Sequence, residues 1–203
     1  MDGPWRGDGA CGTLGVLVTD VLAAVRDPQR LAALRRQVLL DTPPSETFDR
    51  LTRLAARVLD APVALLTLVD EDRQFFKSSV GLPEPFASAR QTPLEFSICQ
   101  YAVAANARLV VEDARADPFL ADHPIVRQFG VVAYAGDVLV FGGHAVGTLC
   151  VLDVRPRAWS EHELATLTDL AATTVEQIRL HRIERLLARR REAGGLPLTR
   201  FPV

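Results

Sequence analysis

Residues 131–153 read VVAYAGDVLVFGGHAVGTLCVLD and place two apolar segments of strand length on either side of Gly142-Gly143. A pair of glycines suits the tight turn of a β-hairpin, because glycine adopts positive φ without a Cβ clash. The second segment, Val146 to Leu152, is apolar or small at every position, which is typical of a strand covered on both faces. We therefore predict an antiparallel hairpin in the middle of a sheet, with room for a pocket beside it.

The composition limits the classes of protein to which the chain can belong. Its 203 residues are 48% hydrophobic and 24% charged, which suits one well-packed domain with flanking helices. A net charge of -2 and a pI near 6.1 provide no general attraction to nucleic acid or to an anionic membrane, so we expect neither as a partner. Cysteines stand at positions 11, 99 and 150 without C-x-x-C spacing. This favours a reducing, cytoplasmic location over a disulfide framework or a structural zinc site.

The remaining segments predict an α/β (α+β) fold. Helices are expected after Asp27-Pro28 and after Ser45, and a long last helix should begin at the capping box of Ser160 and Glu163. The helix after Ser45 should bury a stripe of Phe48, Leu51, Leu54, Ala55 and Val58. Further strands are expected at 63–69, 74–80 and 109–111, and short helices at 95–105 and 123–129. We expect a central antiparallel sheet of five to six strands, with N- and C-terminal helices on one face and a pocket under loops and short helices on the other.

Six segments, two of which begin within residues 131–153, form an ordered pattern along the chain. They read LLDTPPSETFDRLTRLA, VDEDRQFFKSSVGLP, TPLEFSICQYAV, LVVEDARADPFLADHPIV, AYAGDVLV and GTLCVLDVRPRAWSEHELATLTDLA. In this order they resemble the GAF domain family of small-molecule sensor modules, and in particular the bacterial sensory subgroup often found ahead of kinase, cyclase or phosphatase domains. The resemblance implies a ligand pocket between the sheet and the segments that cross it, and terminal helices that pair in a homodimer. It names no ligand or cofactor, because a shared fold does not fix the chemistry of its site.

The resemblance divides the chain into three parts. Residues 1–26 are expected to be a flexible N-terminus with an amphipathic helix, residues 27–182 the GAF domain, and residues 183–203 the end of the last helix and a tail. The apolar stripe of the last helix, from Leu164 to Leu187, outlasts the strands, which also favours a homodimer. Because about a dozen residues follow Arg191, with no output domain among them, we expect any signal to leave through the dimer or a signalling partner protein.

The candidate ligand pocket combines aromatic and polar residues. Its predicted members are Phe76, Phe96, Ser97, Cys99, Tyr134 and Asp137. The aromatic residues, with Phe129, suit a pocket wall and a plain core equally well. Asp137 is a carboxylate in an apolar run, at a place where relatives commonly read Ala-Pro-Leu. Since an unpaired buried carboxylate is costly, it either faces solvent at the strand start, which we favour, or meets an arginine or a ligand donor.

Two cysteines and two histidines are weighed as chemical sites. Cys99 lies near a predicted helix N-terminus, which favours thiolate and redox or attachment chemistry, but a small buried core residue is the preferred interpretation. In bilin-binding relatives a histidine typically follows the attachment cysteine, whereas Gln100 follows here. Cys150 is expected in the core, and whether it lies beside Cys99 is left open. His123 and His144 are expected to be solvated, and no metal site is predicted.

Three functions follow from these observations. The first is a non-enzymatic, small-molecule-sensing or regulatory module in bacterial signal transduction. The second is a thiol-based redox sensor or a methionine sulfoxide reductase-like enzyme that uses Cys99. The third is a scaffold with a vestigial pocket, whose helices bind partners.

Overall fold

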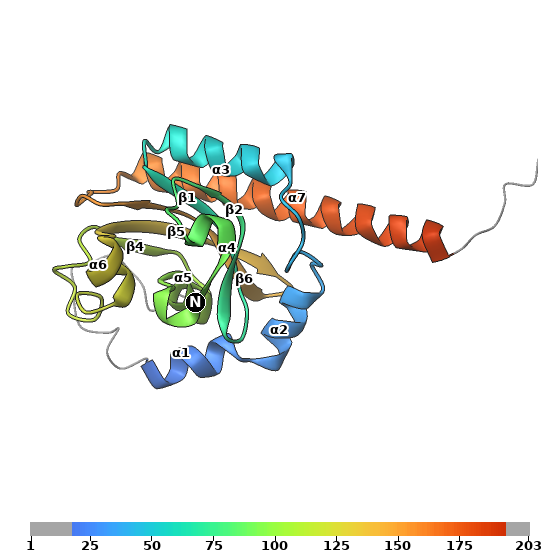
Figure 1. The fold of residues 1–203 in the computed structure, drawn as a ribbon, viewed down its shortest axis with the longest axis horizontal. Coiled ribbons are helices and arrows are strands. Elements are labelled where there is room, and N and C mark those ends of the chain that lie inside the picture. The colour runs from blue at the N-terminus through green and yellow to red at the C-terminus, as the bar shows by residue number, and fades with distance from the viewer. Residues whose placement is uncertain (1–17, 194–203) are drawn as a thin grey trace, which may run out of the picture.

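The computed structural model describes residues 18–193, and their centre is a six-stranded antiparallel sheet (Figure 1). The strands are β1 (Val63–Val69), β2 (Arg73–Val80), β3 (Gln91–Pro93), β4 (Leu109–Val111), β5 (Ala133–Phe141) and β6 (His144–Asp153). They lie in the order β3-β2-β1-β6-β5-β4. The β5–β6 hairpin therefore occupies no edge of the sheet, which confirms the prediction from residues 131–153.

The hairpin turn shows why two glycines are needed. Gly142 and Gly143 have φ values of 61° and 86°, in the left-handed region that other residues avoid. From Ala145 to Asp153 every residue of β6 is buried, because β6 has β1 on one side, β5 on the other and side chains packed over both faces. The prediction of a doubly covered strand is confirmed.

Helices cover both faces of the sheet. They are α1 (Val18–Val25), α2 (Pro28–Arg35), α3 (Glu46–Val58), α4 (Phe86–Ala89), α5 (Cys99–Ala105), α6 (Pro124–Phe129) and α7 (Glu161–Ala193), with a 3-10 turn at Leu94–Phe96. Helices α3 and α7 run side by side over one face, whereas α5 lies on the other (Figure 1). Helix α1 packs against α5, so the first described helix lies on the face opposite α3 and α7. The expected flexible N-terminus falls outside the described residues as far as residue 17.

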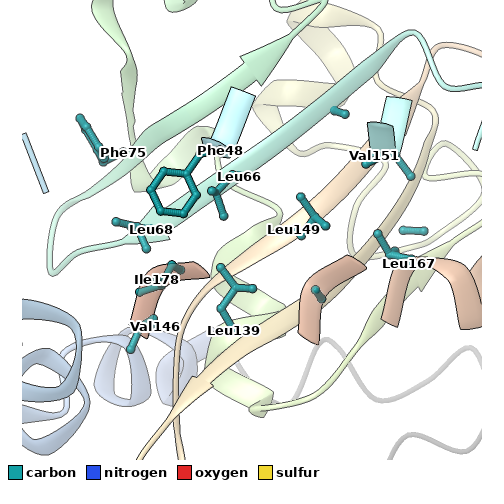
Figure 2. Close-up of a cluster of buried hydrophobic side chains, with 14 of the residues drawn as sticks. Phe48, Leu66, Leu68, Phe75, Leu139, Val146, Leu149, Val151, Leu167 and Ile178 are labelled. Carbon is teal, nitrogen blue, oxygen red and sulfur yellow. The ribbon is translucent and has the colours of Figure 1, made fainter. Parts of the chain in front are cut away.

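Two buried clusters result from the alternation of side chains along the strands. In β1, Leu66 and Leu68 point toward α3 and α7, where they meet Phe48 and Leu149 (Figure 2). Leu65 and Val69 point the other way and join the cluster under α5. The sheet therefore separates a closed core from a second layer, and the second layer contains the candidate site.

Helix α3 buries a different stripe from the one its sequence predicts. Phe48, Thr52, Ala55 and Ala56 are buried, whereas Leu54 and Val58 are exposed. Thr52 fits the buried side because its hydroxyl donates to the Phe48 carbonyl at 3.0 Å, so no polar atom is left without a partner. Small residues on this face let the helix approach β1, β2 and α7 closely.

Helix α7 begins as predicted and continues past the sheet. Ser160 Oγ accepts a hydrogen bond from Glu163 N at 3.2 Å, while Glu163 Oε2 accepts one from Ser160 N at 2.8 Å, which is a complete capping box. The buried positions are Leu167, Ala171, Thr174 and Ile178. After Ile178 no α7 residue up to Arg191 is buried, and this part of the helix extends beyond the domain (Figure 1).

Candidate functional site

A cavity of about 290 Å³ lies on the face of the sheet opposite α3 and α7. Its walls come from β1, β2, β3, β5 and β6, from the loop after β2, and from the starts of α4, α5 and α6. The lining residues are Pro62, Val63, Leu65, Gln74, Phe76, Gly81, Leu82, Pro83, Phe86, Thr92, Phe96, Ile98, Cys99, Ile125, Phe129, Val131, Tyr134, Leu152 and Val154. None of these residues is Asp, Glu, Lys, Arg or His. The lining therefore carries no charged side chain and suits an apolar ligand.

One wall of the cavity is aromatic. Phe86 and Phe129 meet edge to face with ring centroids 4.7 Å apart, and Phe96 lies 5.9 Å from Phe129 in a similar geometry. Such rings attract one another through their quadrupoles and form a firm apolar surface. At the rim, Gly81, Pro83 and Val154 are exposed, so the cavity reaches the surface of the domain.

Two polar side chains interrupt the apolar lining. Gln74 of β2 and Thr92 of β3 stand directly opposite each other in the antiparallel register and therefore share a face. Gln74 Oε1 accepts a hydrogen bond from Ser97 Oγ. Thr92 is only 4% exposed, and its hydroxyl has no hydrogen-bond partner among the described residues. A buried hydroxyl without a partner is uncommon, so Thr92 marks a place where a ligand group or a water completes the site.

A tyrosine and two free cysteines meet at one wall of the cavity, where Tyr134 and Cys99 are part of the lining and Cys150 is buried behind it. Tyr134 Oη donates a hydrogen bond to Cys99 Sγ at 3.4 Å, and Cys99 Sγ lies 3.7 Å from Cys150 Sγ. Gly136 makes this possible, because a Cβ built on it meets Tyr134 Oη at 2.1 Å. The tyrosine hydroxyl therefore occupies the space that the Cβ atom of any residue other than glycine at position 136 would need.

The surroundings change the acidity of these groups in opposite directions. Burial alone raises the pKa of the Cys99 thiol, but interactions with Cys150, Thr148 and Tyr134 outweigh burial and lower this pKa below its usual value. Burial raises the pKa of Cys150 and of Tyr134, and a charged Cys99 beside them adds to both effects. Cys99 is therefore the member of the trio that ionises first.

Asp137 lies on the other face of the sheet, away from the cavity. Its side chain is 13% exposed and pairs with Arg108, and Asp137 Oδ2 also accepts a hydrogen bond from Thr168 Oγ1 of α7 at 2.7 Å. The favoured interpretation, exposure to solvent, is therefore wrong, and the alternative of an arginine partner is correct. The reason is that Arg108, just before β4, and Thr168 of α7 both reach β5 at this point.

The predicted pocket residues divide into two groups. Phe76, Phe96, Cys99 and Tyr134 line the cavity, as does Phe129. Ser97 is not part of the lining; its hydroxyl donates to Gln74 Oε1 and accepts a hydrogen bond from Gln100 N at 3.2 Å, near the start of α5. Asp137 is excluded by the strand alternation, because its neighbours Gly136 and Val138 face the cavity side.

Sequence reasoning missed most of the lining, including its two polar residues Gln74 and Thr92 and the aromatic Phe86, and it misplaced one histidine. Gln74 stands two residues before Phe76 in the same strand, so period-two alternation was a signal for it. Thr92 lies in the three-residue strand β3 and Phe86 begins the four-residue helix α4, and both elements are too short to show a periodicity that points to a face. His123 is buried rather than solvated, since its ring contacts Tyr101 and its Nδ1 accepts a hydrogen bond from Ile125 N at the start of α6.

The sheet, the α3–α7 layer and the cavity on the opposite face together define an α/β domain built around an internal binding-sized space. A family model described as GAF domain matches residues 43–178. The chain belongs to the GAF domain family, which confirms the resemblance that its six ordered segments indicated.

One named relative shares part of its sequence with this domain. The chain is 34% identical over 143 residues to a cyclic di-GMP phosphodiesterase of Pseudomonas aeruginosa, a match that covers 69% of this chain and 24% of the relative. The chain therefore spans about a quarter of that relative's length.

Solved structures share the fold at low sequence identity. The GAF domain of an Acinetobacter phosphoenolpyruvate-protein phosphotransferase is 18% identical with a TM-score of 0.54, covering 83% of this chain and 98% of that one. A free methionine-R-sulfoxide reductase from Neisseria meningitidis, solved with its substrate, is 18% identical with a TM-score of 0.57, covering 75% and 89%. Among residues 18–193, no helix combines the length and apolarity needed to cross a bilayer.

Proposed function

We propose that this GAF domain is a sensory or regulatory module that binds a small uncharged molecule in the cavity beside Phe76 and Thr92. The observation that carries the proposal is the cavity of about 290 Å³ with an unpartnered, buried Thr92 hydroxyl in its wall. Ligand sites are usually apolar clefts with a few polar groups that fix orientation, which is the composition found here. A charged ligand has no partner in this lining, and burying an unpaired charge is costly.

The chemistry of the lining suggests the shape of such a ligand. Phe86, Phe96 and Phe129 supply a flat apolar surface, which suits an aromatic or aliphatic body. Thr92 Oγ1 offers a donor and an acceptor, so the ligand should carry at least one hydrogen-bonding group at that end. Cyclic di-GMP, which the Pseudomonas relative's name mentions, is anionic and does not fit this description.

A route from the cavity to α7 supports a signalling role. Cys150 and Leu152 of β6 line or underlie the cavity, while Leu149 and Val151 of the same strand pack in the core with Leu167 and Ile178 of α7. A ligand that shifts β6 therefore acts on residues that touch α7. Binding would change the populations of two arrangements of α7 in proportion to its differential affinity for them.

We also propose a cytoplasmic homodimer through α7. Beyond Ile178 the helix exposes Leu180, Ile183 and Leu187, which repeat at intervals of three and four residues. This spacing is that of a coiled-coil seam, and a second copy of the same helix buries it. The signal then leaves through the dimer or through a signalling protein that binds the same helices.

The ligand proposal is tested by native mass spectrometry of freshly purified protein and by thermal shift against uncharged metabolites. We expect bound mass, or a stabilising shift with at least one uncharged compound, because a ligand that binds only the folded state stabilises it. Thr92→Val keeps the side-chain shape without the hydroxyl and should weaken binding about tenfold. Ile125→Trp, which fills the cavity from α6, should abolish it. No bound mass and no shift would favour the third function, a scaffold with a vestigial pocket.

A second candidate function is favoured by the 3.7 Å separation of Cys99 Sγ and Cys150 Sγ. A reductase that acts on methionine sulfoxide needs a thiol nucleophile with a second thiol nearby. If the domain is such a reductase, the wild type should turn over free methionine sulfoxide with a dithiol reductant and Cys99→Ser should not. If it is a non-enzymatic module, as the primary proposal holds, neither protein should show turnover.

A further inference from the structure

Cys99 and Cys150 form a buried pair of free thiols at one wall of the cavity. We propose that this pair is an oxidation site for organic hydroperoxides, at which the Cys99 thiolate is oxidised first and Cys150 then closes an intramolecular Cys99–Cys150 disulfide. This reaction goes beyond ligand sensing and beyond reduction of methionine sulfoxide. It requires only that a peroxide enter the cavity, so it stands or fails independently of a resident ligand.

The backbone holds the two cysteines on different elements that pack together. Cys99 is the first residue of α5, Cys150 lies in the centre of β6, and α5 packs across β6. The two sulfur atoms are 3.7 Å apart, in van der Waals contact, and must close to the S–S length of about 2.05 Å when the disulfide forms. In the sheet, Cys150 pairs with Leu65 of β1 on one side and with Gly136 of β5 on the other, and the space beside Gly136 is taken by the Tyr134 ring.

Tyr134 prepares Cys99 for nucleophilic attack. Its hydroxyl donates to Cys99 Sγ at 3.4 Å, and the Cys99 pKa lies below that of an ordinary thiol because polar groups outweigh burial. Burial keeps the pKa of Cys150 high, so Cys150 stays protonated. The thiolate is the nucleophile in thiol chemistry, and Cys99 is the thiol of this pair that lines the cavity, so we assign the nucleophile to Cys99 and the resolving thiol to Cys150.

The cavity gives the oxidant a path to Cys99 alone. Cys99 is part of the lining, whereas Cys150 is fully buried beneath it. The path runs from the exposed rim at Gly81 and Pro83 past apolar and aromatic walls. An organic hydroperoxide with an apolar body buries that body against these walls, whereas hydrogen peroxide gains nothing there.

The reaction balances in two steps. The Cys99 thiolate attacks the terminal oxygen of ROOH, the O–O bond breaks, and the alkoxide leaves as ROH after taking one proton, which gives Cys99–SOH. Cys150–SH then attacks the Cys99 sulfur, the S–O bond breaks and water leaves with the thiol proton. In sum, two thiols lose two electrons and two protons, and ROOH is reduced to ROH and water.

The products predict separate signatures in the full-length chain, in a Cys11→Ser background that excludes pairing with Cys11. After treatment of the reduced protein with one equivalent of cumene hydroperoxide, we expect a non-reducing peptide map to contain the Cys99–Cys150 linked peptide. Cys150→Ser should stop at a Cys99 sulfenic acid that dimedone captures. Cys99→Ala should consume no peroxide above background. Cumene hydroperoxide should react at least tenfold faster than hydrogen peroxide.

Tyr134→Phe tests the activating hydrogen bond without a change of shape. It should slow sulfenic acid formation about tenfold in the Cys150→Ser background, with an unchanged melting temperature. The proposal is overturned if the wild type yields no linked peptide, if Cys99→Ala consumes peroxide at the wild-type rate, or if the two peroxides react equally fast. Each of these results leaves the thermal-shift test of ligand binding unaffected, so failure of this inference and failure of the proposed function are distinguishable.

Discussion

Asp137 on β5 accepts two hydrogen bonds from Arg108, at 3.1 Å from Nε and 2.9 Å from Nη2. This ion pair lies on the face of the sheet that α7 covers. Thr168 of α7 donates to the same carboxylate oxygen at 2.7 Å. One half-buried carboxylate thus joins β5, the segment before β4 and the helix that we propose as the output of the domain.

Asp137→Asn should lower the free energy of unfolding by about 1–2 kcal/mol, because the amide keeps the shape but loses the charge that strengthens both hydrogen bonds. Urea denaturation of Asp137→Asn, Thr168→Val and the double variant measures the coupling between strand and helix. We expect a coupling energy of at least about 0.5 kcal/mol. Strict additivity of the two substitutions would show that the contact does not join β5 to α7.

Gly136→Ala should destabilise the domain by about 1–3 kcal/mol through overpacking. The new Cβ would meet Tyr134 Oη at 2.1 Å and Cζ at 2.6 Å, so the ring must move away from Cys99. Denaturant unfolding of Gly136→Ala in the wild type and in a Tyr134→Leu background provides the comparison. The cost should be much smaller in the second background, and an equal cost in both would place its origin elsewhere.

The lowered pKa of Lys77 leads us to expect that the free energy of unfolding rises at alkaline pH. The residue is 1% exposed and donates to Thr42 Oγ1 at 2.7 Å and to the Pro43 carbonyl at 2.6 Å; burial, with help from Arg90, lowers its pKa from 10.5 to about 8. Below pH 8 the amine is charged in both the folded and the unfolded chain. Between pH 8 and 10.5 the unfolded chain holds the proton more tightly, so the free energy of unfolding increases with pH.

The difference between the wild type and Lys77→Met isolates this effect from other titrating groups. The free energy of unfolding of the wild type minus that of the variant should increase by up to about 3 kcal/mol between pH 7.5 and 10.5. Urea unfolding at each pH measures this difference. A constant difference across this range would mean that Lys77 keeps an ordinary pKa in the folded state.

Substitution of the exposed stripe of α7 should separate dimerisation from folding. Leu180 and Ile183 are 54% and 50% exposed, so Leu180→Glu with Ile183→Glu should leave the fold intact and convert the dimer to a monomer. Leu22→Glu on α1, where the leucine is 41% exposed, is the matched control and should stay dimeric. Sedimentation at micromolar concentration is the measurement, and a monomeric wild type would refute the dimer proposal.

Local signals in the sequence predicted much of the fold. The glycine pair at 142–143 requires positive φ, the unbroken apolar run of β6 requires cover on both faces, and Ser160 with Glu163 satisfies the first amide groups of α7. Each of these depends on residues close together in the chain, so each is visible without a structure. The aromatic members of the pocket followed from the same reasoning and from the resemblance to the GAF family.

Where prediction failed, the deciding contact came from a distant segment. Leu54 and Val58 are as apolar as any core residue, yet α3 turns Thr52 and Ala56 inward because small side chains let it approach β1, β2 and α7. Asp137 was expected to face solvent because burying an unpaired carboxylate is costly, and an arginine or a ligand donor was the alternative. Arg108 stands 29 residues before it and meets it only because β4 pairs with β5.

The sequence by itself determined the family, the central hairpin, the start of α7 and the aromatic members of the pocket, since these depend on ordered motifs, local conformational preference and burial pattern. Only the tertiary structure decided that Cys99 and Cys150 are in contact and that the Tyr134 hydroxyl lies beside Gly136 and donates to Cys99. It also decided that the Asp137 side chain faces α7 rather than the cavity. Cys99 and Cys150 are separated by 51 residues. No local sequence pattern indicates that residues this far apart in the chain are neighbours, because the packing of α5 across β6 brings them together.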